Sequence, residues 1–239
     1  MSTALIDPRA LPATKRGTTQ SFEDTTKGSF IGRLQLYSRQ PEVTEGLIPV
    51  NHYGIKESAR EITDLGESCD VLPLAMRHKA VDMSDREAIA TSYDAASPTY
   101  QRIVEKAKEG GMNGYMHGIS FLLFERKTGR LLEFYCCNES ARRAAKYVFP
   151  YLPLTPADID ALKAEGTDTA GMQPHGPLPI TLKGDLITKG KNKWHAPVVL
   201  KCSTPFTNVP PLEKLVAAIT AFLSVEDDGI EVADTTRVR

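Results

Sequence analysis

The amino-acid sequence predicts an α+β fold, built as a mostly antiparallel sheet or a partly closed barrel with helices inserted at its edges. Two pairs of apolar segments, each pair joined by a short polar loop, indicate hairpins over 119–136 and 180–202. Helix-like segments lie between and after these hairpins, so strands and helices do not alternate as they do in a parallel doubly wound sheet. With 239 residues, of which 41% are hydrophobic, the chain is long enough to bury a substantial core.

The first third of the chain is predicted to be a tail followed by strands. Residues 1–27 mix Ser, Thr, Pro, Lys and Asp without a hydrophobic period, which is typical of a flexible N-terminal tail. Strands are then expected at 29–37, 46–55 and 69–80. Pro49 places the second strand at an edge or a strand start, and Pro73 indicates a bulge or bend in the third. The segment 83–93 fits either a capped helix or an extended strand.

A helix and then a central hairpin follow. Ser97 is suited to cap the helix, with Pro98 at its first position. The hairpin strands are expected at 119–124 and 131–136, and Gly129 in the loop between them can adopt the positive φ that a bulged turn needs. Neither strand alternates between apolar and polar residues, so both faces of each should be covered, as in the middle of a sheet.

The next helix has an apolar face and a basic face. Asn138 is a candidate N-cap, and Pro150 ends the helix. Its apolar positions recur at helical spacing: Ala141, Ala144, Ala145 and Val148. Its opposite face carries three cations: Arg142, Arg143 and Lys146.

The last third is predicted to hold a short helix, a loop, a second hairpin and a final amphipathic helix. These are expected at 155–166, 167–179, 180–202 and 212–223. The final helix should bury Leu215, Ile219 and Phe222 along one stripe. We interpret 226–239 as a C-terminal tail, which leaves 28–225 as a single domain.

The bulk composition limits where the protein can act. A formal net charge of -1 produces no global field, so a surface that binds anions must be local. No window approaches the roughly 18 apolar residues of a membrane span, and no signal-peptide run precedes the domain. We therefore expect a cytoplasmic protein without a membrane segment. Adjacent Cys136 and Cys137 would face opposite sides of a strand, so buried free thiols are expected rather than disulfides.

Sequence motifs for catalysis are absent. The chain has no phosphate-binding glycine loop, no dinucleotide turn, no nucleophile elbow and no zinc-ligand spacing. Its histidines are not paired in sequence with a thiol or carboxylate, so we predict no catalytic residue, metal ligand or cofactor. One group of carboxylates fits either turns between strands or a divalent-metal site, and turns are the simpler interpretation. This group comprises Asp64, Glu67, Asp70, Asp82 and Asp85.

Basic and aromatic residues are interleaved along the two hairpins and the helix after the first. In single-stranded DNA-binding proteins, cations follow the phosphates and exposed rings stack on bases. The candidate nucleic-acid-binding residues are Lys189, Lys191, Lys193, Trp194, His195, Arg126, Lys127, Arg130, Arg142 and Arg143. The alternative is that the lysines of the second tip are merely solvated and discourage edge pairing, while Trp194 lies in the core.

In this layout the chain resembles the single-stranded DNA-binding proteins that many bacteriophages encode. Those proteins are OB-fold barrels with helical insertions, basic hairpins and often an acidic C-terminal tail. The resemblance rests on 121–136, 189–194 and the acidic segment 226–228. It implies an OB-like barrel and sequence-independent binding of single-stranded DNA in replication or recombination. The family has no sharp linear motif, so the candidate residues rest on the basic and aromatic pattern alone.

Two other classes of function remain open. The first is a structural or assembly protein of the virion type, which would use the final helix as a docking face. The second is an enzyme whose site is assembled from residues distant in sequence. A stable homo-oligomer without affinity for nucleic acid would favour the first, and metal-dependent turnover would favour the second.

Overall fold

Ten strands form one open sheet in the computed structural model, which describes residues 6–12, 31–57, 61–85, 88–110, 113–224 and 231–232. The strands are β1 (Gly32–Tyr37), β2 (His52–Lys56), β3 (Ile62–Gly66), β4 (Ser68–Asp82), β5 (Ala88–Ser92), β6 (Tyr115–Glu125), β7 (Arg130–Cys136), β8 (Ile180–Lys189), β9 (Asn192–Lys201) and β10 (Glu231–Val232). Their order is β10-β5-β4-β6-β7-β1-β2-β3, and β8 joins β4 and β9. Among these strands the β1–β7 pair is parallel and the others are antiparallel. The α+β class and the mostly antiparallel sheet are thus confirmed, and the sheet is not closed into a barrel.

The long strand β4 is the centre of this sheet. One of its edges pairs with β6 from Val71 to Asp82, and its other edge pairs with β8 near its start and with β5 near its end. The β4–β6 register shifts between Pro73 and Ala75, at the predicted bulge. A bulge is expected there because proline has no N–H to donate to the neighbouring strand.

Five α-helices surround the sheet. They are α1 (Pro41–Thr44), α2 (Pro98–Lys108), α3 (Glu139–Val148), α4 (Pro156–Ala164) and α5 (Leu212–Ser224). Three of them begin with side-chain caps: Ser97 accepts from Tyr100 N, Asn138 from Ala141 N, and Thr155 from Asp158 N. These caps satisfy backbone donors that have no partner inside the helix. The caps at Ser97 and Asn138 are predicted by the sequence, and Thr155 caps a helix that is predicted to begin there.

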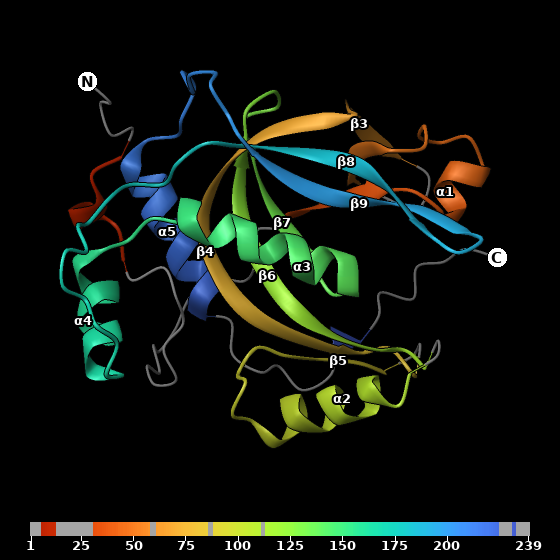
Figure 1. Ribbon diagram of the computed structural model, residues 1–239, viewed down its shortest axis with the longest axis horizontal. Coiled ribbons are helices and arrows are strands. Elements are labelled where there is room, and N and C mark those ends of the chain that lie inside the picture. Colours follow the sequence, from red (N-terminus) through yellow and green to blue (C-terminus); the bar gives the residue numbers. More distant parts are fainter. Residues whose placement is uncertain are drawn as a thin grey trace.

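The sheet carries an apolar core on each face. On one face, Phe121 and Leu123 of β6 pack with the alanine side of α3, and on the other, Leu122 and Phe124 pack with α5. Figure 1 shows α3 lying across the sheet in front of β4 and β6, with α2 along its lower edge. All four β6 side chains are at most 1% exposed, so both faces of this hairpin are covered, as the sequence predicts.

Two elements differ from the expected strands. Residues 47–51 form turns, so the second strand begins at His52, and β3 is an additional strand that the sequence pattern does not predict. The ambiguous segment 83–93 contains the extended strand β5. Two residues of its possible capping box, Arg86 and Glu87, lie outside the described residues.

Parts of both predicted tails contact the domain. Ile6 and Leu11 are buried in the same core cluster as α5, although the sequence predicts a flexible tail over 1–27. β10 pairs with β5 through Glu231 and Val232, inside the segment predicted as the C-terminal tail. The acidic residues 226–228 lie outside the described residues.

The sequence predicts buried free thiols, and three of the four cysteines agree with this prediction. All four cysteines are free thiols, and Cys69, Cys136 and Cys202 are buried while Cys137 is half-buried. Among the helices of the described ranges, none combines the length and the apolar composition needed to cross a membrane.

We expect Phe121→Ala to destabilise the protein by roughly 3–5 kcal/mol, because truncating a fully buried aromatic side chain leaves a cavity. Phe121 is 0% exposed, whereas Tyr147 on α3 is 67% exposed. Tyr147→Ala is therefore the control, with an expected change within about 0.5 kcal/mol. Urea denaturation of both variants measures the difference. A loss below about 1 kcal/mol for Phe121→Ala would contradict the central place of β6.

Candidate nucleic-acid interface

The β8–β9 hairpin presents three lysines at its tip. Lys189 pairs with Asn192 across a two-residue loop, and Gly190 in that loop has a φ of 61°. A two-residue hairpin with glycine in its first loop position needs this positive φ. Lys189, Lys191 and Lys193 are all exposed, and none of them forms an ion pair with another described residue. The tip therefore carries three positive charges that the rest of the described fold leaves uncompensated.

Trp194 and His195, at the base of this tip, anchor the hairpin, the first through its ring and the second through its backbone. The Trp194 indole Nε1 donates to Ser140 Oγ of α3 at 3.1 Å, and the ring is half-buried. The backbone N–H of His195 donates to Ser38 Oγ, just after β1, at 2.8 Å. Trp194 is thus neither a core residue nor a freely exposed stacking platform. It joins the base of the tip to α3.

The basic residues of the β6–β7 tip are mostly engaged within the fold. Arg126 forms an ion pair with Asp70 at 2.7 Å, and Arg130 forms one with Glu57. Lys127 is exposed. Because both guanidinium groups already face carboxylates, this tip offers less free positive charge than its composition suggests.

The buried Glu125 shapes the same tip. Its carboxylate accepts hydrogen bonds from the backbone N–H groups of Lys127 and Thr128 and from the Thr128 hydroxyl. A cavity of about 440 Å³ lies beside the tip, lined by Asp70, Arg126 and Phe206 among other residues. The groups that line this cavity are of mixed charge, so it has no preference for a phosphate.

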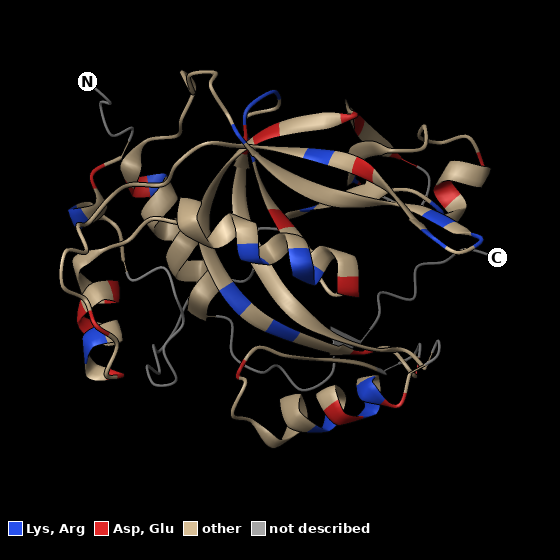
Figure 2. Cartoon of the chain, viewed as in Figure 1, with Lys and Arg blue, Asp and Glu red and all other residues tan. Residues whose placement is uncertain are grey.

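The two basic tips do not form one groove. Asp70, the partner of Arg126, precedes Val71, which pairs with Ile180 at the start of β8. The tip at Lys189 lies nine residues further along β8, which at about 3.3 Å per residue is roughly 30 Å. Figure 2 shows the two groups of basic positions at separate ends of the sheet. Arg126, Lys127 and Arg130 therefore do not share a surface with the lysines of the second tip.

Helix α3 extends the basic surface from the β8–β9 tip. Arg143 lies one turn after Ser140, the residue that contacts Trp194. Its ion pair with Glu139 is exposed on both sides, and is therefore weaker than the partly buried pairs of Arg126 and Arg130. Lys146 follows on the exposed side and has no ion pair with a described residue. We call the exposed cations of the tip and of α3 the basic strip, which consists of Lys189, Lys191, Lys193, Arg143 and Lys146.

Arg142 points away from this strip. Its Nη1 lies 2.8 Å from Nε2 of His117 on β6, and both side chains are half-buried. Burial lowers the pKa of His117, and the positive charges of Arg142 and Lys108 lower it further. A neutral His117 ring can accept the hydrogen bond from Arg142, so this arginine holds α3 on the sheet.

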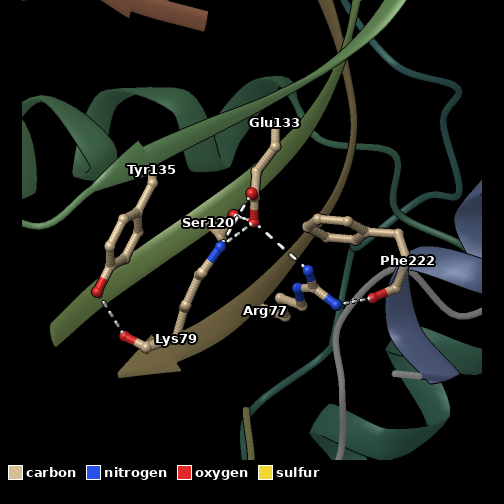
Figure 3. A network of polar contacts seen from close by, with 6 residues as sticks. All are labelled: Arg77, Lys79, Ser120, Glu133, Tyr135 and Phe222. Carbon is tan, nitrogen blue, oxygen red and sulfur yellow. Dashed lines mark hydrogen bonds and ion pairs between the residues drawn. The ribbon is translucent and has the colours of Figure 1, made fainter. Parts of the chain in front are cut away.

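A second polar cluster lies inside the sheet, and the sequence pattern does not predict it. Arg77 and Lys79 of β4 converge with Ser120 of β6 on Glu133 of β7, as Figure 3 shows. Lys79 Nζ lies 2.9 Å from both carboxylate oxygens of Glu133, and Ser120 Oγ donates to Oε1 at 2.6 Å. Each charged side chain of this cluster is at most 12% exposed.

The cluster also holds the end of α5. Arg77 Nη1 donates to the backbone carbonyl of Phe222 at 2.5 Å, and its guanidinium lies over the rings of Tyr93 and Phe222. The last carbonyls of a helix have no partner inside it, so Arg77 satisfies one of them. These contacts give the cluster a structural role, because its charged groups face one another and the end of a helix.

The charges of the cluster determine its protonation. Burial alone would raise the pKa of Glu133, but Lys79, Arg77 and the Ser120 hydrogen bond outweigh it and lower the pKa to about 2. Burial lowers the pKa of Lys79, and Glu133 opposes this effect. Glu133 is therefore ionised throughout the physiological range.

Three of the carboxylates considered for a metal site, Asp64, Asp70 and Asp82, are used in turns and ion pairs. Asp64 contacts His52 Nδ1 and accepts from the backbone N–H of Gly66, and Asp70 contacts Arg126 and Thr181. In the part of the chain that the structure describes, no three His, Cys, Asp or Glu side chains are placed to hold a metal ion.

Comparison with known proteins gives no relative for this arrangement: no protein-family model, no curated protein and no solved structure matches the chain.

We expect Glu133→Gln to destabilise the protein by roughly 3–5 kcal/mol at neutral pH, because it leaves two buried cations without their carboxylate. The folded-state pKa of Glu133 is lowered from 4.5 to about 2, so its stabilisation is present above pH 4.5 and is lost as the pH falls toward 2. The variant should therefore lose less stability than wild type across that window. Glu139→Gln is the control, since it breaks only the exposed pair with Arg143.

Chemical denaturation at neutral pH and at several values down to about pH 2 measures both effects. Wild-type stability for Glu133→Gln at neutral pH would show that the buried cluster does not depend on the carboxylate.

Proposed function

We propose that this protein binds single-stranded DNA without sequence preference, through the basic strip at the β8–β9 tip and on α3. The observation that carries the proposal is the exposure of Lys189, Lys191 and Lys193 on a projecting hairpin, with no ion pair to a described residue. Cations in such a position gain most from a phosphate backbone, because binding releases the counterions that the nucleic acid had condensed.

The local arrangement matters more than the total charge. Screening limits the reach of surface charges to about 8 Å at physiological salt, so a net charge of -1 does not repel DNA from a basic strip. The contact of Trp194 with Ser140 keeps the tip beside α3, which supports a continuous path for a strand. The two arginines of the β6–β7 tip are not part of this path, because Asp70 and Glu57 engage them.

The resemblance to phage-encoded single-stranded DNA-binding proteins belongs to the same proposal. A basic hairpin on a mostly antiparallel sheet supports it, and the sheet here is open where an OB-like barrel would be closed. A role in replication or recombination of phage DNA is the context that this resemblance implies.

The docking role considered for the final helix has less support. The apolar stripe of α5, formed by Leu215, Ile219 and Phe222, is at most 1% exposed and packs against the strands of its own chain. An assembly protein that docks through this stripe would first have to uncover its own core.

We expect the triple variant Lys189→Gln, Lys191→Gln and Lys193→Gln to bind single-stranded DNA more weakly and with a flatter salt dependence. Each lost phosphate contact removes about 0.7 from the slope of log affinity against log salt, so three lost contacts remove about 2. Fluorescence anisotropy with a labelled oligo-dT between about 50 and 200 mM salt measures the slope.

A charge-matched control separates the tip from general electrostatics. Lys108 of α2, Lys163 of α4 and Lys214 of α5 are exposed, have no ion pair with a described residue and lie outside the basic strip. Their triple glutamine variant should keep the wild-type slope. An equal loss of affinity in both triple variants would show that binding depends on general electrostatic attraction and not on the tip. A wild-type protein that does not bind oligo-dT at about 50 mM salt would contradict the proposal.

A further inference from the structure

Tyr147 is the aromatic side chain that stands free beside the basic strip. It is 67% exposed, which exceeds the exposure of every other large apolar side chain in the described ranges. Single exposed apolar residues are common on protein surfaces, so exposure alone assigns no role. The position of Tyr147 on α3, beside the basic strip, indicates a role in binding.

Tyr147 lies on the stripe of α3 that faces the hairpin. Ser140, which accepts the Trp194 hydrogen bond, precedes Tyr147 by seven residues, so the two side chains share one face two turns apart. At 1.5 Å per residue they are separated by about 10 Å along the axis. Arg143 lies one turn before Tyr147 on the same side of the helix, whereas Lys146, the preceding residue, points to a different side. The ring therefore lies beside Arg143 and continues the line that begins at the tip.

The helix holds this ring in place. Ala144, Ala145 and Val148 beneath it are at most 4% exposed in the core. A tyrosine side chain has few rotatable bonds, so a ring on such a helix offers a contact surface at low entropic cost. Trp194, at the base of the tip, is half-buried and donates its indole N–H to Ser140.

We propose that Tyr147 forms a stacking subsite for an unpaired nucleobase of a strand whose phosphates lie on the basic strip. The inference rests on the proposed function and deepens it. A base stacks on an exposed ring without being read, so the subsite takes any base. Bases in a duplex already stack on one another, so the subsite favours a single strand over a duplex of equal charge. Trp194 positions the tip, and Tyr147 holds the base.

The test uses the full-length protein and two probes of equal length and charge. One is an oligo-dT of about 20 nucleotides, which exceeds the footprint of one binding domain, and the other is the same backbone with abasic sites throughout. Tyr147→Ala should weaken binding to oligo-dT roughly 5- to 150-fold, the range that corresponds to loss of one stacked base. It should leave binding to the abasic probe and the salt dependence unchanged. Tyr147→Phe keeps the ring and should bind oligo-dT as wild type does.

Leu212→Ala provides the control for an exposed apolar residue away from α3, since Leu212 is 40% exposed at the start of α5. This variant should bind both probes as wild type does. Melting temperatures of all variants verify that the fold is intact.

The possible results distinguish failure of the Tyr147 subsite from failure of the proposed DNA binding. If the wild type binds oligo-dT and Tyr147→Ala binds it equally well, the stacking subsite is wrong and the proposed function stands. The same holds if the wild type binds both probes alike, or if Tyr147→Ala weakens both to the same extent. A wild type that binds neither probe overturns the proposed function together with the subsite.

Discussion

The fold depends on the pairing of β4 along both of its edges. With fifteen residues, β4 is long enough to pair with β6 on one side and with β8 and β5 on the other. Its two faces are covered by separate apolar cores, with Val71 in one and Leu72 in the other. Its edge toward β6 is paired from Val71 to Asp82, and its other edge is paired at the two ends, by β8 over 68–71 and by β5 over 80–82. This pairing fixes where both basic hairpins leave the sheet.

Burial of β4 costs free energy at its two cations, because both lose contact with water. Arg77 and Lys79 are each 6% exposed, and a buried cation is tolerated only with a partner. Glu133 supplies the negative charge from β7, and the carbonyl of Phe222 accepts a hydrogen bond from Arg77. The cluster thereby links three strands to α5. Replacing a whole buried ion-pair cluster with apolar residues is often neutral, whereas removing one partner leaves an uncompensated buried charge and is strongly destabilising.

The distribution of surface charge follows from the same architecture. The two arginines of the β6–β7 tip are neutralised by carboxylates of other segments, Arg126 by Asp70 of β4 and Arg130 by Glu57 directly after β2. The β8–β9 tip extends beyond these strands, so Lys191 meets no carboxylate there. Exposed cations without an ion pair to a described residue also lie on the strands, as Arg33 and Lys183 do, but three of them gather at this tip. This concentration of unpaired cations favours the tip over the β6–β7 loop in the proposal that the protein binds a polyanion.

Local pattern was sufficient for the elements whose signals lie within a few residues: the caps at Ser97 and Asn138, the bulge at Pro73 and the tip lysines. These depend on backbone donors, on the missing N–H of proline and on turn geometry, which neighbouring residues determine. Tertiary structure decided which side chains are engaged, because their partners are distant in the sequence. Asp70 lies 56 residues from Arg126, and Ser140 lies 54 residues from Trp194. Strand order brings them together, and no short stretch of sequence encodes that order.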